Sequence, residues 1–119
     1  MQDRTRAKVA AIVAAASLKT QVVKVTDLDA GHVYRIRVML RNNRVDGFDY
    51  HSEHHFKGMS DQSLNFYDYG TQAHVHLQLT GRKILGYDLE TETAFNGQVH
   101  GRLISLYDYE TEQTYRFTV

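Results

Sequence analysis

Two residue types are missing from this chain, and each absence excludes something. None of the 119 residues is a cysteine, so the protein can contain neither a disulfide bond nor a catalytic thiolate. None is a proline either. Because proline removes a hydrogen-bond donor from a sheet, a chain without it suits a fold made mostly of paired strands.

Net charge and long apolar runs are also lacking. The 14 Lys and Arg residues balance 14 Asp and Glu residues, so we expect no nucleic-acid partner. No apolar run is long enough to span a membrane. The charges are nevertheless uneven, because residues 1–47 carry nine basic and four acidic side chains and residues 48–119 carry five and ten. Either two parts of one fold attract each other, or a dipolar surface docks a partner or a second copy.

The N-terminal residues predict a helix. Asp3 is a candidate N-cap, alanine is the best helix former, and neither glycine nor proline interrupts the segment from Asp3 to Leu18. Residues 4–18 also resemble a secretory signal, because basic residues precede an apolar stretch with a small-residue box at 14–16. That stretch is mostly alanine, and Asp3 lies in its basic part. We therefore expect a helix in a cytoplasmic protein, with secretion as the alternative.

A repeat of about 20 residues, the length of one β-hairpin, dominates the rest of the chain. An Asp recurs at five equivalent positions, which are Asp27, Asp49, Asp68, Asp88 and Asp108. An Asp carboxylate at the start of a turn accepts hydrogen bonds from backbone N–H groups two or three residues on. We therefore interpret the five as turn-capping residues of five hairpin repeats. Gly31, in the first turn, is expected in the left-handed conformation.

Apolar residues recur with a period of two from Gln21 onward, which sorts the side chains onto two faces. One face is almost wholly apolar, includes Val23 and Val25 near its start, and must be the core. We predict a mainly β fold, in which an N-terminal helix precedes an up-and-down antiparallel meander of about ten short strands. The sheet is expected to be strongly curved or an incompletely closed barrel, with the helix on its apolar concave face. A single domain covers 1–119, with the helix in 1–20 and the hairpin repeats in 21–119.

Histidines cluster in the second and third repeats. His74 and His76 are two residues apart on a predicted strand, so both rings point to the same face. His55 shares that face, and Glu53 precedes it in the turn. His74 and His76, with either His55 or Glu53 as the third ligand, could form an open site for Zn²⁺. The alternative is that they are solvent-facing polar residues of strands and turns.

An aromatic row and a basic stripe lie on the second, polar face. The row consists of Phe48, Tyr67, Tyr87 and Tyr107, each directly before a repeat Asp. Such rings can stack on a sugar or on partner side chains, or they can form a cross-strand ladder that stabilises the sheet. Arg35 and Arg37 belong to the basic stripe, which could bind a phosphate or carboxylate group or could stay solvated.

These patterns support three hypotheses of different classes. The leading one is a non-enzymatic binding or assembly module without a cofactor, which presents a curved sheet as a homo-oligomer or to a protein partner. The first alternative is a metal-binding protein or metal-dependent hydrolase that uses the His cluster. The second is a carrier that holds a small apolar ligand in a barrel cavity. The sequence contains no nucleophile–base arrangement and no glycine loop of the kind that cradles phosphate.

Overall fold

The computed structural model describes all residues from 1 to 119 as one helix and an 11-stranded antiparallel sheet. The elements are α1 (Asp3–Leu18), β1 (Val25–Asp27), β2 (His32–Tyr34), β3 (Ile36–Arg41), β4 (Arg44–Asp49), β5 (His54–Met59), β6 (Phe66–Asp68), β7 (Ala73–Thr80), β8 (Lys83–Asp88), β9 (Thr93–His100), β10 (Leu103–Asp108) and β11 (Gln113–Thr118). The strand order is β2-β1-β11-β10-β9-β8-β7-β6-β5-β4-β3. The predicted mainly β meander is therefore confirmed.

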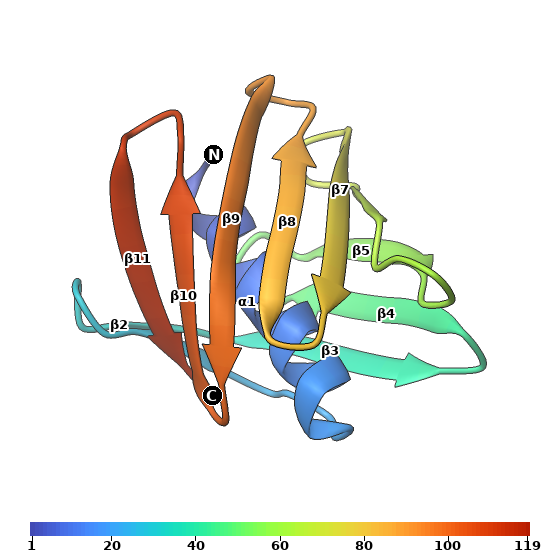
Figure 1. Ribbon diagram of the computed structural model, residues 1–119. Coiled ribbons are helices and arrows are strands. Elements are labelled where there is room, and N and C mark those ends of the chain that lie inside the picture. Colours follow the sequence, from blue (N-terminus) through green and yellow to red (C-terminus); the bar gives the residue numbers. More distant parts are fainter.

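The sheet curls into a nearly closed barrel around α1, as Figure 1 shows. The last strand, β11, pairs with β1, where Thr26 lies opposite Thr118. The first repeat thus covers the edge that the last strand would otherwise expose. β2 and β3 stand at the two ends of the strand order, yet only Arg35 separates them along the chain. The barrel therefore has one seam, beside the bend at Arg35.

The seam results from a mismatch in residue number between two facing segments. Val25 pairs with Tyr34 in the β1–β2 ladder, and Val22 forms an isolated bridge with Val38. All four of these side chains are buried. Between the two pairs, two residues on one segment face three on the other, so the hydrogen-bond ladder cannot continue and the sheet opens.

This interruption corrects one expectation about the core face. Val23 was predicted to point inward with Val25, but its side chain is 60% exposed. Val22 occupies the inward position instead, with an exposure of 4%. Strict alternation fails here because the chain leaves the sheet between Val22 and Val25.

The helix fills the inside of the barrel. Its residues from Thr5 to Ala15 are all buried, and five of them are alanines, whose small side chains let the strands pack closely around the helix. Gln2 occupies the N-cap position, so the prediction that Asp3 caps the helix was wrong and Asp3 is the first helical residue. Lys19 ends the helix in the left-handed conformation, and its N–H donates to the carbonyl of Ala15. α1 does not have the length or apolarity of a membrane-crossing helix.

Large aromatic side chains complete the core between the helix and the strands. Phe56 lies opposite Gly47, and Phe95 lies opposite Gly86, in neighbouring strands. A Cβ atom at either glycine would lie 2.1 Å from a carbon of the facing ring. Both positions therefore require glycine, because the phenylalanine ring uses the space that a side chain would occupy.

Candidate functional site

The five repeat Asp residues gather at one end of the barrel, which we call the acidic end. It comprises the turns that follow them, at residues 27–32, 49–54, 68–73, 88–93 and 108–113. Each carboxylate is buried and accepts a hydrogen bond of 2.9 to 3.0 Å from the backbone N–H two residues on. The predicted turn-capping role is confirmed for all five.

Each of these turns also holds one residue in the left-handed conformation. Gly31, with φ of 66°, has the conformation expected for it. The other four turns place a non-glycine residue there, namely Glu53, Gln72, Glu92 and Glu112, with φ between 56° and 58°. Left-handed backbone is unfavourable for residues with a side chain, so the repeated turn imposes this geometry in spite of its cost.

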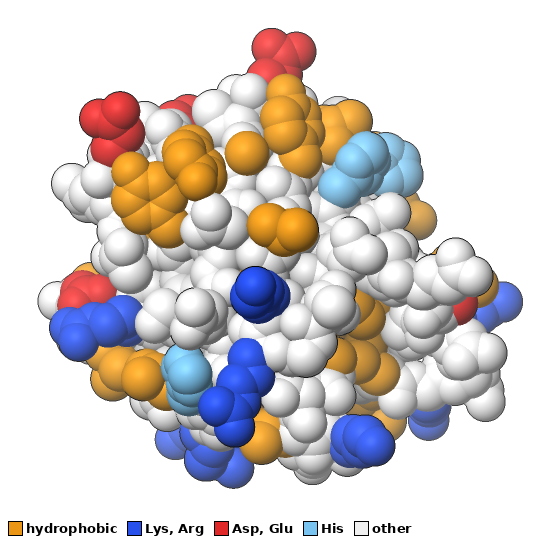
Figure 2. All heavy atoms as spheres, in the orientation of Figure 1, with side chains coloured by type: hydrophobic (Ala, Val, Ile, Leu, Met, Phe, Trp, Pro, Cys, Tyr) orange, Lys and Arg blue, Asp and Glu red, His pale blue; other side chains and the backbone are white.

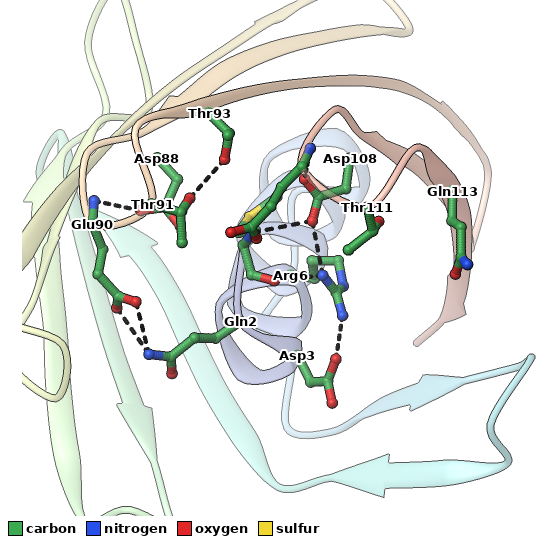
Figure 3. Close-up of polar contacts among 12 residues, drawn as sticks. Gln2, Asp3, Arg6, Asp88, Glu90, Thr91, Thr93, Asp108, Thr111 and Gln113 are labelled. Atoms are coloured by element: carbon green, nitrogen blue, oxygen red, sulfur yellow. Dashed lines mark hydrogen bonds and ion pairs between the residues drawn. The ribbon is translucent and has the colours of Figure 1, made fainter.

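Three of the buried carboxylates also bind cations that project from the helix inside the barrel. The pairs are Arg4 with Asp49 (Nε to Oδ2, 2.7 Å), Lys8 with Asp68 (Nζ to Oδ2, 2.6 Å) and Arg6 with Asp108 (Nη1 to Oδ2, 2.8 Å; Figure 3). Lys8 also lies 3.8 Å from Asp49. These contacts tie the first half of α1 to three separate hairpins. Sequence reasoning missed them, although the opposite net charges of residues 1–47 and 48–119 were the signal that could have revealed them.

The five buried carboxylates of the acidic end, which we call the carboxylate ring, differ in their pKa shifts. Burial acts to raise the pKa of Asp49, but the hydrogen bond and charge of Arg4 outweigh it and hold that pKa below its ordinary value. Burial raises the pKa of Asp88, which accepts hydrogen bonds from Glu90 and Thr91 but pairs with no side-chain cation (Figure 3). Asp88 therefore keeps its desolvation cost, whereas at Asp49 the corresponding cost is offset by Arg4.

Exposed apolar side chains surround the outside of the acidic end and form what we call the rim. The rim consists of Tyr50, Tyr69, Tyr87, Leu89 and Tyr109, which are 40% to 52% exposed. Glutamates separate these side chains at the turns, and Figure 2 shows apolar and acidic side chains together near the top of the molecule. Aromatic side chains of this kind provide contact area with little loss of conformational entropy.

Most residues of the predicted aromatic row pack against the rim, and only Tyr87 belongs to it. Of its four members only Tyr87 is exposed, and Phe48, Tyr67 and Tyr107 are half-buried. Each half-buried ring packs edge-on against the aromatic residue that follows the repeat Asp, with ring centroids 4.8 to 4.9 Å apart. In these three pairs the residue after the Asp is thus the more accessible one, and binding by Phe48, Tyr67, Tyr87 and Tyr107 stays a prediction.

The predicted metal ligands lie on the outer face near the rim. His55 packs against Phe48, and His74 packs against Tyr67, each with ring centroids 4.8 Å apart. Glu53 and His76 are exposed as well. No three His, Asp or Glu side chains converge in a geometry that would hold a metal ion. Metal binding by His55, His74, His76 and Glu53 stays a prediction that metal analysis of the purified protein would test.

The opposite end of the barrel has the opposite charge, and we call it the basic end. Its exposed cations are Lys19, Arg41, Arg44, Arg82, Lys83 and Arg102, which accompany a single exposed Asp at position 61. Figure 2 shows basic side chains near the bottom of the molecule and acidic ones at the top. The helix has the same polarity, because its N-terminus lies at the acidic end and its C-terminus at the basic end, which is favourable for the helix dipole.

Two arginines of the predicted basic stripe, Arg35 and Arg37, lie at neither end, whereas its other two members, Arg41 and Arg44, belong to the basic end. Arg35 and Arg37 flank the seam, together with Lys24 and Tyr50, around a groove on the outside of the barrel. Comparisons with known proteins give no further guide, since no family model, no curated protein and no solved structure matches this chain.

Proposed function

We propose that this protein is a non-enzymatic assembly module whose copies associate head to tail, the acidic end of one on the basic end of the next. The observation that carries the proposal is the separation of charge between the two ends. Exposed glutamates crowd one end, and six exposed cations against one Asp occupy the other. Complementary charges of this kind steer encounter and fix orientation.

The rim adds the apolar contact that charge alone does not provide. Tyr50, Tyr69 and Tyr109 are about half exposed, and tyrosine is enriched among the residues that contribute most to binding. Their rings would face arginine side chains of the next copy, a pairing that adds cation–π attraction to the ion pairs. The rim rings of Tyr50, Tyr69 and Tyr109 are also held in place by their edge-on contacts, so less conformational freedom is lost on association.

The filled interior supports an assembly role over a carrier role. The helix and the aromatic core occupy the space inside the barrel, where an apolar ligand would have to lie. A rigid body with different surfaces at its two ends makes heterologous contacts, which produce rings or filaments rather than isologous dimers.

Two complementary variants test this proposal. One reverses the acidic end with Glu92→Lys and Glu112→Lys, and the other reverses the basic end with Arg82→Glu and Lys83→Glu. We expect wild-type protein to form concentration-dependent oligomers in sedimentation velocity at about 0.01 M ionic strength, and to dissociate near 1 M, where the Debye length falls to about 3 Å. Each variant alone should be monomeric.

The equimolar mixture of the two variants is the decisive sample. The intact basic end of the first variant fits the intact acidic end of the second, and the two reversed ends are also complementary in charge, so the mixture should at least dimerise. Lys57→Glu, on the exposed side of β5, is the matched control and should leave assembly unchanged. A wild-type protein that stays monomeric at low ionic strength, or a mixture that does not dimerise, would show the proposal to be wrong.

A further inference from the structure

The seam creates a groove with a volume of about 670 Å³ on the outside of the barrel. It exists because the ladder opens where two residues face three, between the Val25–Tyr34 pair and the Val22–Val38 bridge. The groove is lined by Val23, Lys24, Val33, Arg35, Arg37 and Tyr50. Its volume lies within the range of small-molecule sites, which is about 300–1,000 Å³.

Three cations share this groove without an anionic partner. The side-chain ion pairs of the protein use Arg4, Arg6, Lys8 and Arg116, so Lys24, Arg35 and Arg37 stay unpaired. The Nε of Arg37 is shielded from solvent and donates to no acceptor. Like charges held close together repel each other, and an anion bound between them would relieve that repulsion.

The remaining lining of the groove is apolar and unusually accessible. Val23 is 60% exposed, Val33 51% and Tyr50 50%. Valine is normally among the more buried residue types, and here two valines and a tyrosine ring flank the cations. A ligand that satisfies this lining needs an anionic group and a flat apolar body in one molecule.

From this combination we infer that the seam groove is a binding site for a small organic anion, with a carboxylate or phosphate monoester group attached to an apolar ring. The guanidinium groups of Arg35 and Arg37 bind the anionic group, for which a planar fork of donors is well suited. The side chains of Val23, Val33 and Tyr50 contact the apolar body. The groove lies along the side of the barrel and shares only Tyr50 with the rim, so its two arginines are separate from the head-to-tail contact.

Phenyl phosphate, inorganic phosphate and phenol serve as probes in titrations of isotope-labelled full-length protein followed by NMR. We expect phenyl phosphate to shift the amide signals of Val23, Val33 and Arg35, and to bind at least tenfold more tightly than either of the other two. The double variant Arg35→Gln/Arg37→Gln should weaken phenyl phosphate binding at least tenfold, since it removes the charged donors. Arg44→Gln, which removes an exposed charge of the basic end, is the matched control and should leave binding unchanged.

Tyr50→Ala tests the apolar part of the site apart from the arginines. It should weaken phenyl phosphate binding and leave the weak binding of inorganic phosphate unaltered. Since all substituted side chains point outward, the dispersion of the amide signals should match that of wild type and report a folded barrel. Equal affinity for inorganic phosphate and phenyl phosphate would overturn the inference, as would shifts confined to the basic end. Unchanged phenyl phosphate binding in the double arginine variant would also overturn it.

Discussion

The two ends of the barrel close their hairpins by different means. At the acidic end, a buried Asp begins each of the five turns, and three of these carboxylates also bind a cation of the helix. At the basic end, the turns close locally. Asn42 and Asn43 both have positive φ, as in a type I′ turn, and Gly81 and Gly101 take the left-handed position of the other two-residue turns.

The difference shows that a repeated turn can have two roles at once. Each Asp of the acidic end uses one oxygen for its own backbone, and at three positions the second oxygen is available to a long-range partner. The turns of the basic end contain no such buried acceptor, and their charged side chains are exposed. The acidic end therefore holds the helix in the barrel, whereas the basic end is free to carry surface function.

Removal of a helix cation that pairs with the carboxylate ring of the acidic end should have the largest effect on stability. Lys8→Met leaves the buried carboxylates of Asp68 and Asp49 without their shared partner. We expect a loss of about 3–5 kcal/mol in the free energy of unfolding, the usual cost of an uncompensated buried charge. Lys19→Met, at the exposed end of the same helix, should change stability by less than about 0.5 kcal/mol. Urea unfolding measures both, and equal values would show that the ring does not hold the helix.

Two members of the ring should respond oppositely to loss of charge. Asp49→Asn should cost about 1–3 kcal/mol at neutral pH, because Arg4 loses its charged partner. Asp88→Asn should leave stability unchanged or raise it, because burial already disfavours the charged form of Asp88. Urea unfolding at pH 7 compares the two variants with wild type.

The effects of Asp49 and Asp88 on stability should also depend on pH in opposite ways. The pKa of Asp49 is lowered from 3.8, so its contribution to stability is present above pH 3.8 and is lost as the pH falls through the lower, folded value. The pKa of Asp88 is raised from 3.8, so its cost is absent at low pH and develops as the pH rises through the higher, folded value. Asp88→Asn should therefore approach wild type below pH 3.8, and Asp49→Asn should do so only below the lower, folded pKa of Asp49. A difference that persists there would mean that shape, not charge, decides their effect.

Substitution of a left-handed residue at either end should have a smaller effect on stability. Gly101→Ala places a side chain at φ of 59° and should cost about 1 kcal/mol. Glu92→Gly, at φ of 56°, should be neutral or stabilising by up to about 1 kcal/mol, because it removes the same strain from the acidic end. Thermal unfolding measures both changes. A loss of stability in Glu92→Gly would reveal a contact of that side chain that outweighs its backbone strain.

Neutralisation of the basic end should have the smallest effect on folding. Arg82→Gln, Lys83→Gln and Arg102→Gln together should change the free energy of unfolding by no more than about 1 kcal/mol, since the three side chains are exposed. The same triple variant should lose head-to-tail association in sedimentation velocity. Strong destabilisation would indicate that the basic end, too, holds the fold together.

Local sequence patterns predicted most of the architecture but few of the contacts at the acidic end. The Asp period predicted the hairpins, and alternation predicted the inward side chains, because both depend on residues close in sequence. The pairs from Arg4 to Asp49 and from Lys8 to Asp68 span 45 and 60 residues. Such contacts require the helix to be placed inside the barrel first, so composition could suggest them but no spacing could identify the partners.

The sequence by itself determined a helix, a meander of Asp-capped hairpins and a continuous apolar face, because the backbone period and the turn chemistry are properties of a few adjacent residues. Tertiary structure alone decided which carboxylates receive a cation, which ring of each aromatic pair is exposed, and where the barrel stays open. The seam illustrates the reason. Val23 turns outward because closure brings two residues opposite three, and that count exists only when Val22, before β1, meets Val38 of β3 around the filled barrel.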